Sequence, residues 1–311
     1  MAIERAHVAV HPKPWGVTDL RPWSDAGGGA ARIGEVSFER TDRTAPATTL
    51  LLKLLFTSEP LSIQVHPDDN YARSIGLPNG KSEAWYVLDA APGATVAVGL
   101  KAPLHQDQLR QAINDGSIAN LVDWQPVKAR DVIAVPAGTI HAIGAGVVIA
   151  EIQQRSDATF RLFDHGRARA LHIDDALAVA VRAPPDVQPQ SERLSAERTL
   201  LAANSHFVLE RLTLASGSAW CLDAARETWL VVLDGIANAG TYDLVRGDAL
   251  FAEYEQVDLT VGRIGLECLV AYTGAGGPLP LLLQRIAQQG ARDAAPSGNH
   301  PGAYLQIGAH S

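Results

Sequence analysis

The segment that most constrains this chain covers residues 61–83, LSIQVHPDDNYARSIGLPNGKSE. It begins on a predicted strand with Gln64 and His66, and it ends at the start of another predicted strand with Lys81 and Glu83. Residues two apart on a strand point to the same side, so each pair shares one face. A short predicted helix and a turn separate the strands, and this connection allows the two pairs to fold back toward each other.

A second histidine follows a tight glycine turn further along the chain, in the sequence PAGTIH that ends at His141. Together, His66, Glu83 and His141 form a mixed nitrogen and oxygen set of the kind that binds zinc-like ions. Gln64 is the fourth candidate ligand; because an amide oxygen is a poor zinc ligand, a hydrogen bond in the pocket is its alternative role. The pattern predicts a metal site inside a β-barrel.

The composition is typical of a globular protein and limits the partners that we expect. The 311 residues suffice for two domains, 47% of them are apolar, and the formal net charge is −8. An acidic chain argues against nucleic acid or an anionic membrane as a main partner, whereas a local cluster of basic residues is enough to bind a small phosphorylated substrate. We find no apolar run of bilayer length and no signal-peptide core, so we expect a cytoplasmic protein. We also expect a monomer or a small homo-oligomer.

Short predicted strands separated by glycine and aspartate turns dominate both halves of the chain. This pattern predicts a mainly β fold with two jelly-roll β-barrels and a few covering helices, of which 104–121 is the clearest. Residues 7–38 look irregular apart from a short strand at 35–38. The sequence ETWLVVLDG at 227–235 resembles EAWYVLDAAPG at 83–93, so we expect the second barrel to be a degenerate copy of the first.

A proline-rich stretch marks the predicted boundary between the two barrels. The sequence PPDVQPQS lies at residues 184–191 and is typical of a linker. We therefore expect a metal-binding domain over 1–185, a second domain without metal ligands over 192–290, and a C-terminal tail over 291–311.

Four ordered blocks resemble the type I mannose-6-phosphate isomerases (phosphomannose isomerases), a family of the cupin superfamily. The blocks are LSIQVHPDDNYA, GKSEAWYVLDAAPGA, VPAGTIHAIGAG and EIQQRSDATFRLFD, and they span roughly residues 50 to 175. The chain lacks the helical insert of longer members, which makes it similar to the short bacterial form. This resemblance implies two cupin-type barrels, a single zinc ion per chain, and an aldose–ketose isomerase that interconverts mannose 6-phosphate and fructose 6-phosphate through an enediol.

The resemblance also places the family's functional residues on this sequence. Its metal ligands fall on Gln64, His66, Glu83 and His141, its catalytic arginine on Arg161, and its active-site lysine and acid on Lys81 and Glu151.

The chemistry of the three catalytic candidates agrees with these roles. A carboxylate that follows an apolar run, as Glu151 does, is costly to bury unless it is paired, and an inward Arg161 requires an anion. The alternatives are a structural ion pair for Glu151 and a solvated turn position for Lys81.

The chain departs from the family pattern at a few positions. Arg155 stands where the family usually has asparagine, and Phe160 where tyrosine is common. Ser37 stands where the family often has a tryptophan after the sequence GEV. None of these changes removes a ligand, but Arg155 is a candidate for altered phosphate or substrate preference. Three alternative functions are an isomerase of a related phosphosugar or aldose, a non-catalytic metal-containing cupin that only binds sugars, and an iron dioxygenase.

Overall fold

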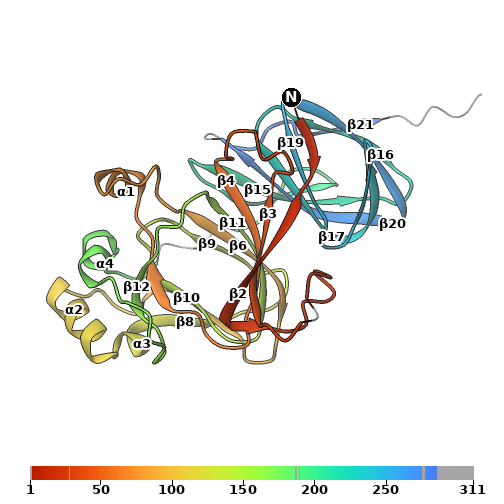
Figure 1. The fold of residues 1–311 in the computed structure, drawn as a ribbon. Coiled ribbons are helices and arrows are strands. Elements are labelled where there is room, and N and C mark those ends of the chain that lie inside the picture. Colours follow the sequence, from red (N-terminus) through yellow and green to blue (C-terminus); the bar gives the residue numbers. More distant parts are fainter. Residues whose placement is uncertain (1, 28, 186–187, 189, 275–276, 286–311) are drawn as a thin grey trace, which may run out of the picture.

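The computed structural model describes residues 2–27, 29–185, 188, 190–274 and 277–285, and these form a mainly β protein (Figure 1). The predicted mainly β fold is confirmed, and the predicted tail over 291–311 lies outside the described residues. Along the chain the elements are β1 (Ala2–Arg5), β2 (His7–Val17), β3 (Ile33–Glu39), β4 (Leu50–Phe56), β5 (Ile63–Val65), α1 (Asp69–Ser74), β6 (Glu83–Ala90), β7 (Thr95–Leu100), α2 (Gln106–Asp115), α3 (Ile118–Leu121), β8 (Val122–Pro126), β9 (Val132–Val135), β10 (His141–Ile143), β11 (Val147–Gln154), β12 (Phe160–Phe163), α4 (Ile173–Val179), β13 (Glu192–Arg193), β14 (Arg198–Ala203), β15 (Phe207–Leu214), β16 (Ala219–Ala224), β17 (Thr228–Ala239), β18 (Tyr242–Val245), β19 (Ala249–Glu253), β20 (Glu255–Thr273) and β21 (Leu282–Arg285).

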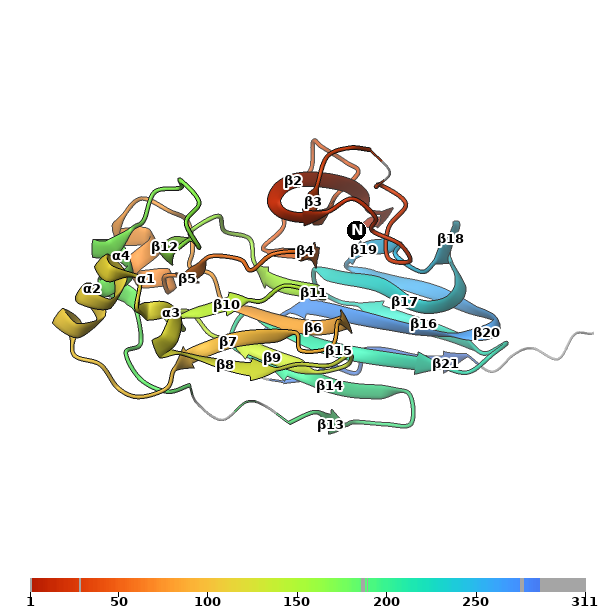
Figure 2. The ribbon, with the colours of Figure 1, turned by 90° about the horizontal axis from the view of Figure 1, so that it is seen from below.

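The N-terminal half, here called the first unit, is built from two antiparallel sheets. One has the strand order β2-β3-β4-β11-β6-β9 and the other the order β12-β5-β10-β7-β8. Buried side chains from both sheets, among them Trp85 and Ile143, pack together between them. The outer face of the second sheet is covered by α2, α3 and α4, which contribute Leu109, Ile118 and Leu177 to a further core (Figure 2). Helices therefore cover the face of the second sheet that points away from the first sheet.

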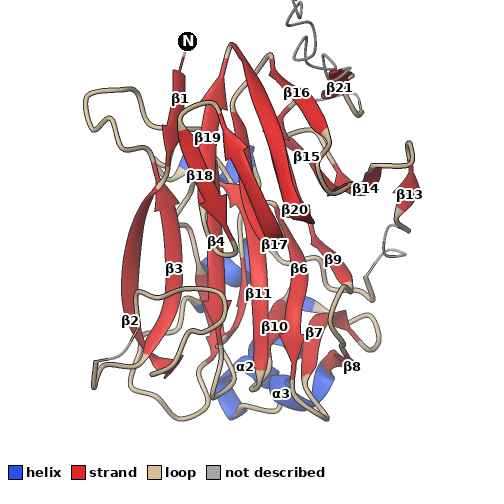
Figure 3. Ribbon diagram, turned by 90° about the vertical axis from the view of Figure 1, so that its right-hand side faces the viewer, coloured by secondary structure: helices blue, strands red, loops and turns tan. Residues whose placement is uncertain are grey.

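The C-terminal half, here called the second unit, is one ten-stranded sheet that packs against the first unit. Its main path is β1-β19-β17-β20-β15-β14-β13, so the N-terminal strand β1 pairs with β19 rather than with its neighbour in sequence. One continuous core joins the two units and includes Leu52 and Tyr86 from the first and Trp229 and Phe251 from the second. Viewed from the side of the second unit, β17 and β20 are drawn alongside β11 and β6 (Figure 3).

Strand alternation gives the sheet of β4, β11 and β6 two different faces. On β4, Leu50, Leu52 and Leu54 belong to the core shared with the second unit. The residues between them, including Lys53, point to the opposite side, because successive side chains on a strand alternate. The same sheet thus has one face backed by the second unit and one face turned into the first unit.

Two sequence predictions are wrong. Residues 7–38 are not mostly irregular, because His7–Val17 forms β2, which pairs antiparallel with β3. The predicted helix over 104–121 is two helices, Gln106–Asp115 and Ile118–Leu121, because Gly116 adopts a left-handed conformation with φ 78° and ends the first of them. By contrast, the short helix predicted between the strands that carry His66 and Glu83 is present as α1, and Asp68 caps it by accepting a hydrogen bond from the Tyr71 amide.

Hydrogen bonds support the internal repeat that we expected from the sequence. The Trp85 indole donates to Glu83 and the Trp229 indole donates to Glu227, each over 3.2 Å. The amide of Val87 donates to the Asp131 carbonyl and that of Val232 to the Asp248 carbonyl, over 2.9 Å in both cases.

The domain limits given above stay a prediction. Among the described residues, no helix combines the length and the apolar character that a membrane crossing requires.

Candidate metal centre

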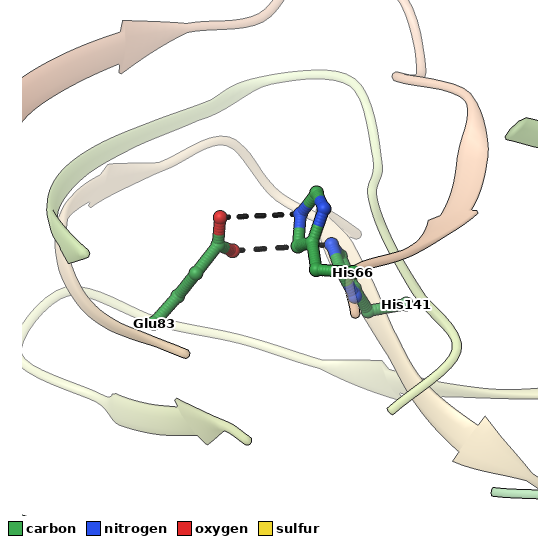
Figure 4. A group of neighbouring side chains, drawn as sticks. All are labelled: His66, Glu83 and His141. Atoms are coloured by element: carbon green, nitrogen blue, oxygen red, sulfur yellow. Dashed lines mark ion pairs between the residues drawn. The ribbon is translucent and has the colours of Figure 1, made fainter. Parts of the chain in front are cut away.

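Three buried side chains from three different strand ends meet between the two sheets of the first unit. His66 directly follows β5, Glu83 begins β6, and His141 begins β10. Each offers one ligand atom, and these atoms lie within 4.8 Å of one another. Figure 4 shows both imidazole rings and the carboxylate directed toward one another. All three residues are 2% exposed or less, so water does not solvate the cluster.

Backbone carbonyls fix the tautomer of both histidines. His66 Nδ1 lies 2.7 Å from the Ala158 oxygen, and His141 Nδ1 lies 2.9 Å from the Thr139 oxygen. A carbonyl oxygen only accepts hydrogen bonds, so Nδ1 carries the proton in each neutral ring. The Nε2 lone pairs consequently face the cluster: His66 Nε2 lies 3.2 Å from Glu83 without a hydrogen-bond partner among the described residues, and His141 Nε2 lies 3.9 Å from Glu83. Histidines that bind metals commonly donate their other ring N–H to a carbonyl oxygen in this way.

The protonation states of the cluster suit a cation. Burial, reinforced by the nearby Lys81 ammonium, lowers the pKa of His66 to about 3, and burial also lowers the pKa of His141. Burial opposes ionisation of Glu83, but the adjacent Lys81 ammonium holds the pKa of its carboxyl well below the usual range. Two neutral imidazoles therefore face an ionised carboxylate.

An orphaned pair of polar atoms tests whether these residues fit a metal ion. His66 Nε2 and Glu83 Oε1 lie 3.2 Å apart, and within the described residues neither atom has a hydrogen bond of good geometry, although the Lys81 ammonium forms an ion pair with Glu83 Oε1 at 3.0 Å. Both atoms present lone pairs, and burying unsatisfied polar atoms is costly. A cation between them would satisfy both, so the residues fit a metal ion.

Gln64 lies beside this cluster, as the sequence predicted. It pairs with His141 across β5 and β10, and its amide nitrogen is 3.3 Å from His141 Nε2. The Ser62 hydroxyl donates to the Gln64 amide oxygen over 3.0 Å. Its assignment as a fourth ligand stays a prediction, and it requires the amide to turn so that the oxygen faces the cluster.

The predicted catalytic side chains line one cavity of about 400 Å³ together with Glu83. Lys81, Glu151 and Arg161 all contribute to its wall, which also includes Gln64. Lys81 is buried, with Nζ 3.0 Å from Glu83 Oε1, rather than solvated in a turn. The site thus places two cationic side chains and the Glu151 carboxyl group next to the cluster of His66, Glu83 and His141.

Glu151 occupies the least favourable position in the cavity for a negative charge. Burial, and after it the neighbouring Glu83 carboxylate, raises the pKa of Glu151 to about 8. A carboxyl group with a pKa near neutrality can both accept and donate a proton, which suits general acid–base catalysis.

Arg161 is a cation without an anionic partner. One of its guanidinium nitrogens lies 3.4 Å from the Ala170 carbonyl, and Nε is buried without a hydrogen bond. Among the described residues, no carboxylate lies within ion-pair distance of it. Arg169, which also lines the cavity, is instead tied to Asp164 over 2.6 Å. Arg161 is therefore available to an anion that enters the cavity.

Several charged residues of the cavity were not identified from the sequence. Lys13, Glu35 and Lys53 come from β2, β3 and β4 and line the same wall. Lys53 lies opposite Glu151 in the β4–β11 register, and its Nζ is 3.0 Å from the Gln153 side-chain oxygen. The signal was a lone lysine within the apolar run TTLLLKLLF, since a charge on a buried strand needs partners.

Arg155, the candidate for altered substrate preference, lies elsewhere. Its Nε donates to the Thr48 hydroxyl over 2.8 Å, and it forms an ion pair with Glu39 at 3.1 Å. It is not among the residues that line the cavity. The substitution at this position therefore leaves the lining unchanged.

Comparisons with known proteins point to one family. The mannose-6-phosphate isomerase of Streptococcus mutans is 37% identical over 212 residues, which are 65% of this chain and 67% of that protein. The mannose-6-phosphate isomerase ManA of Bacillus subtilis is 38% identical over 137 residues, 42% of this chain and 43% of that protein. No family model matches the chain.

Solved structures share the fold over most of the chain. The mannose 6-phosphate isomerase from Bacillus subtilis superposes with a TM-score of 0.74 at 23% identity, covering 87% of this chain and 99% of that one. The apo mannose 6-phosphate isomerase from Salmonella typhimurium gives a TM-score of 0.69 at 16% identity, covering 88% of this chain and all of that one, 100%. The predicted fold with two cupin-type barrels agrees with this likeness.

Proposed function

Since the chain belongs to the mannose-6-phosphate isomerase family, we propose that it interconverts mannose 6-phosphate and fructose 6-phosphate through an enediol. The observation that carries this proposal is one cavity whose wall includes Glu151, Arg161 and Glu83, and Glu83 also belongs to the buried cluster with His66 and His141.

The proposed resident ion is a single zinc per chain. His66, Glu83 and His141 would hold it, with Gln64 as the fourth ligand. When bound, zinc supplies Lewis acidity that polarises sugar oxygens without a change of redox state. The neutral Nε2 atoms and the ionised carboxylate support this assignment.

Aldose–ketose isomerisation moves a proton between two adjacent carbons, so the site must contain a base. We assign this role to Glu151, which accepts the proton from one carbon and returns it to the other. Because its pKa is raised, Glu151 can both accept and donate a proton near neutral pH. The reaction is reversible, and a group with a pKa near the working pH serves both directions.

Lys81 and Arg161 are the proposed electrostatic partners of the substrate. Neighbouring carboxylates keep the pKa of Lys81 above its usual value in spite of burial, so its ammonium remains charged and donates hydrogen bonds to developing oxyanion charge. The guanidinium of Arg161 is free to form paired hydrogen bonds with phosphate or enediolate oxygens. Arg169 adds positive charge to the same cavity.

The test follows zinc-loaded protein with mannose 6-phosphate in heavy water by NMR. We expect fructose 6-phosphate to form, and deuterium to enter at the carbon that receives the proton. Glu151→Gln abolishes both signals, whereas the matched variant Glu39→Gln retains them because Glu39 binds Arg155 outside the cavity. Folded, zinc-loaded protein that converts no mannose 6-phosphate would contradict the proposal, and conversion of another phosphosugar would shift it to the related isomerase.

A further inference from the structure

A buried carboxylate of the second unit occupies the position that corresponds to Glu83 in the repeat. Glu227 precedes β17 as Glu83 begins β6, and each accepts a hydrogen bond from the tryptophan two residues later. In the first unit this carboxylate belongs to the candidate metal cluster. Glu227 is 6% exposed, so its carboxyl group depends on hydrogen-bond partners within the protein.

The structure places Glu227 against the start of β4 in the first unit. Its Oε2 accepts from the Thr49 amide over 2.7 Å and from the Thr49 hydroxyl over 2.6 Å, and its Oε1 accepts from the Leu50 amide over 2.9 Å. Together with the Trp229 indole, all of its hydrogen-bond partners are donors. Each of the two carboxyl oxygens accepts from a backbone amide, and the NH₂ group of a glutamine could not accept either of these hydrogen bonds, so these contacts select glutamate over glutamine.

Glu227 contacts the start of β4, and this strand places the charged side chain of Lys53 in the cavity wall. Leu50, Leu52 and Leu54 on β4 pack into the core shared with the second unit, whereas Lys53 faces the opposite side. Lys53 lies opposite Glu151 and contacts Gln153. A shift at the start of β4 is therefore transmitted to the side chain beside the proposed base.

We propose that Glu227 is a positioning residue for the first unit's active site: it anchors β4 from behind and thereby sets Lys53 against Glu151. This inference rests on the proposed function. It gives the second unit a defined part in the reaction, as the rigid backing of the catalytic sheet, because precise placement of catalytic groups requires support from behind.

The test compares Glu227→Gln with a matched variant of another buried carboxylate. Glu210 is fully buried in the second unit, but its partners Arg198 and Tyr272 belong to the same unit and do not reach β4. Glu210→Gln therefore reports the cost of a buried carboxylate without the contact to β4. Each variant is loaded with zinc and measured for kcat, KM, zinc content, thermal midpoint and amide hydrogen exchange.

We expect Glu227→Gln to lower kcat by about tenfold while zinc content and KM stay unchanged, because β4 holds none of the proposed ligands. Amide exchange at Thr49 and Leu50 should accelerate. Glu210→Gln should lower the thermal midpoint with little change in kcat. The milder Thr49→Val, which removes the hydroxyl donor from an exposed residue, keeps the test valid if Glu227→Gln does not fold, and we expect it to lower kcat by a smaller factor.

Faster amide exchange at Thr49 and Leu50 together with a wild-type kcat would overturn the inference, since Glu227 would then be a structural anchor only. Equal losses of kcat in the Glu227→Gln and Glu210→Gln variants would also overturn it. Failure of the proposed function gives a different result, because the wild-type protein itself would then lack isomerase activity while the exchange data remained interpretable.

Discussion

His66 Nε2 faces Glu83 Oε1 at 3.2 Å, and the proton that would normally bridge two such acceptors is on Nδ1, on the far side of the ring, which donates it to the Ala158 carbonyl. This relationship is unfavourable in an empty protein interior and favourable around a cation. It is produced by strand ends from both sheets, so the fold itself brings these atoms together.

Replacing the carboxylate of Glu83 should remove metal affinity. Glu83→Gln replaces the only charged ligand atom of the His66, Glu83 and His141 set with a neutral amide, and we expect zinc affinity to fall by more than ~100-fold. Titration calorimetry on metal-free protein measures this. His165→Asn is the control, because His165 bonds the Leu61 carbonyl and is not part of the set. Unchanged zinc affinity in Glu83→Gln would exclude this site.

Removing the guanidinium of Arg161 should weaken use of the phosphosugar. Arg161→Gln loses the unpaired cation of the cavity, and we expect kcat/KM to fall by about 100-fold, because charge-assisted contacts to phosphate are lost. Steady-state kinetics measures this. Arg155→Gln, with its native partners outside the cavity, should leave kcat/KM unchanged. Equal effects of the two substitutions would contradict the assigned roles.

The metal-free protein should lose stability as the pH rises from about 7 to about 8. In that range Glu151 is ionised in the unfolded chain but holds its proton in the folded one, where its pKa is raised to about 8. The folded state therefore binds more protons, and the free energy of unfolding falls with pH. His66 and His141 have lowered pKa values and are neutral in the folded state there, and their residual protonation in the unfolded chain opposes this slope only in part.

Urea unfolding of metal-free protein at several pH values checks this prediction. Glu151→Gln carries no titrating carboxyl at the position and should show a flatter profile than the wild type. A wild-type stability that rises over the same pH range would show that Glu151 is ionised in the folded state.

The connection before Lys81 should tolerate no side chain at Gly80. A Cβ there would lie 2.4 Å from the Asp68 carbonyl carbon and 2.7 Å from the Asp69 amide nitrogen, and both are backbone atoms. Gly80→Ala must displace the segment that carries Lys81, and we expect a loss of about 1–3 kcal/mol in the free energy of unfolding together with weaker zinc binding. Gly29→Ala is the control, since nothing lies within 4 Å of its added Cβ. Wild-type stability of Gly80→Ala would contradict the packing described here.

The predicted metal set could be derived from sequence because strand periodicity acts locally. Gln64 and His66, two apart on or beside β5, and Glu83 at the start of β6 need only strand alternation and a short return of the chain. His141 follows a turn in which Gly138 has a positive φ of 86°. Local rules place each of these residues, and the antiparallel pairing of β5 with β10 brings them together.

Other features depend on contacts between distant segments and were missed for that reason. Pro12 and Pro14 lower the strand propensity of β2, yet pairing with β3 stabilises it at the sheet edge, where proline is tolerated. The partners of Lys53 come from β11, about a hundred residues away in sequence. The contact of Glu227 with Thr49 likewise spans the two units. No local pattern encodes such pairs.

Metal-dependent isomerisation is tested by measuring activity on mannose 6-phosphate before and after removal of bound metal with a chelator, and again after zinc is restored. We predict that fructose 6-phosphate formation disappears on chelation and returns with one equivalent of zinc per chain. Activity that persists in protein shown to contain no metal would contradict it.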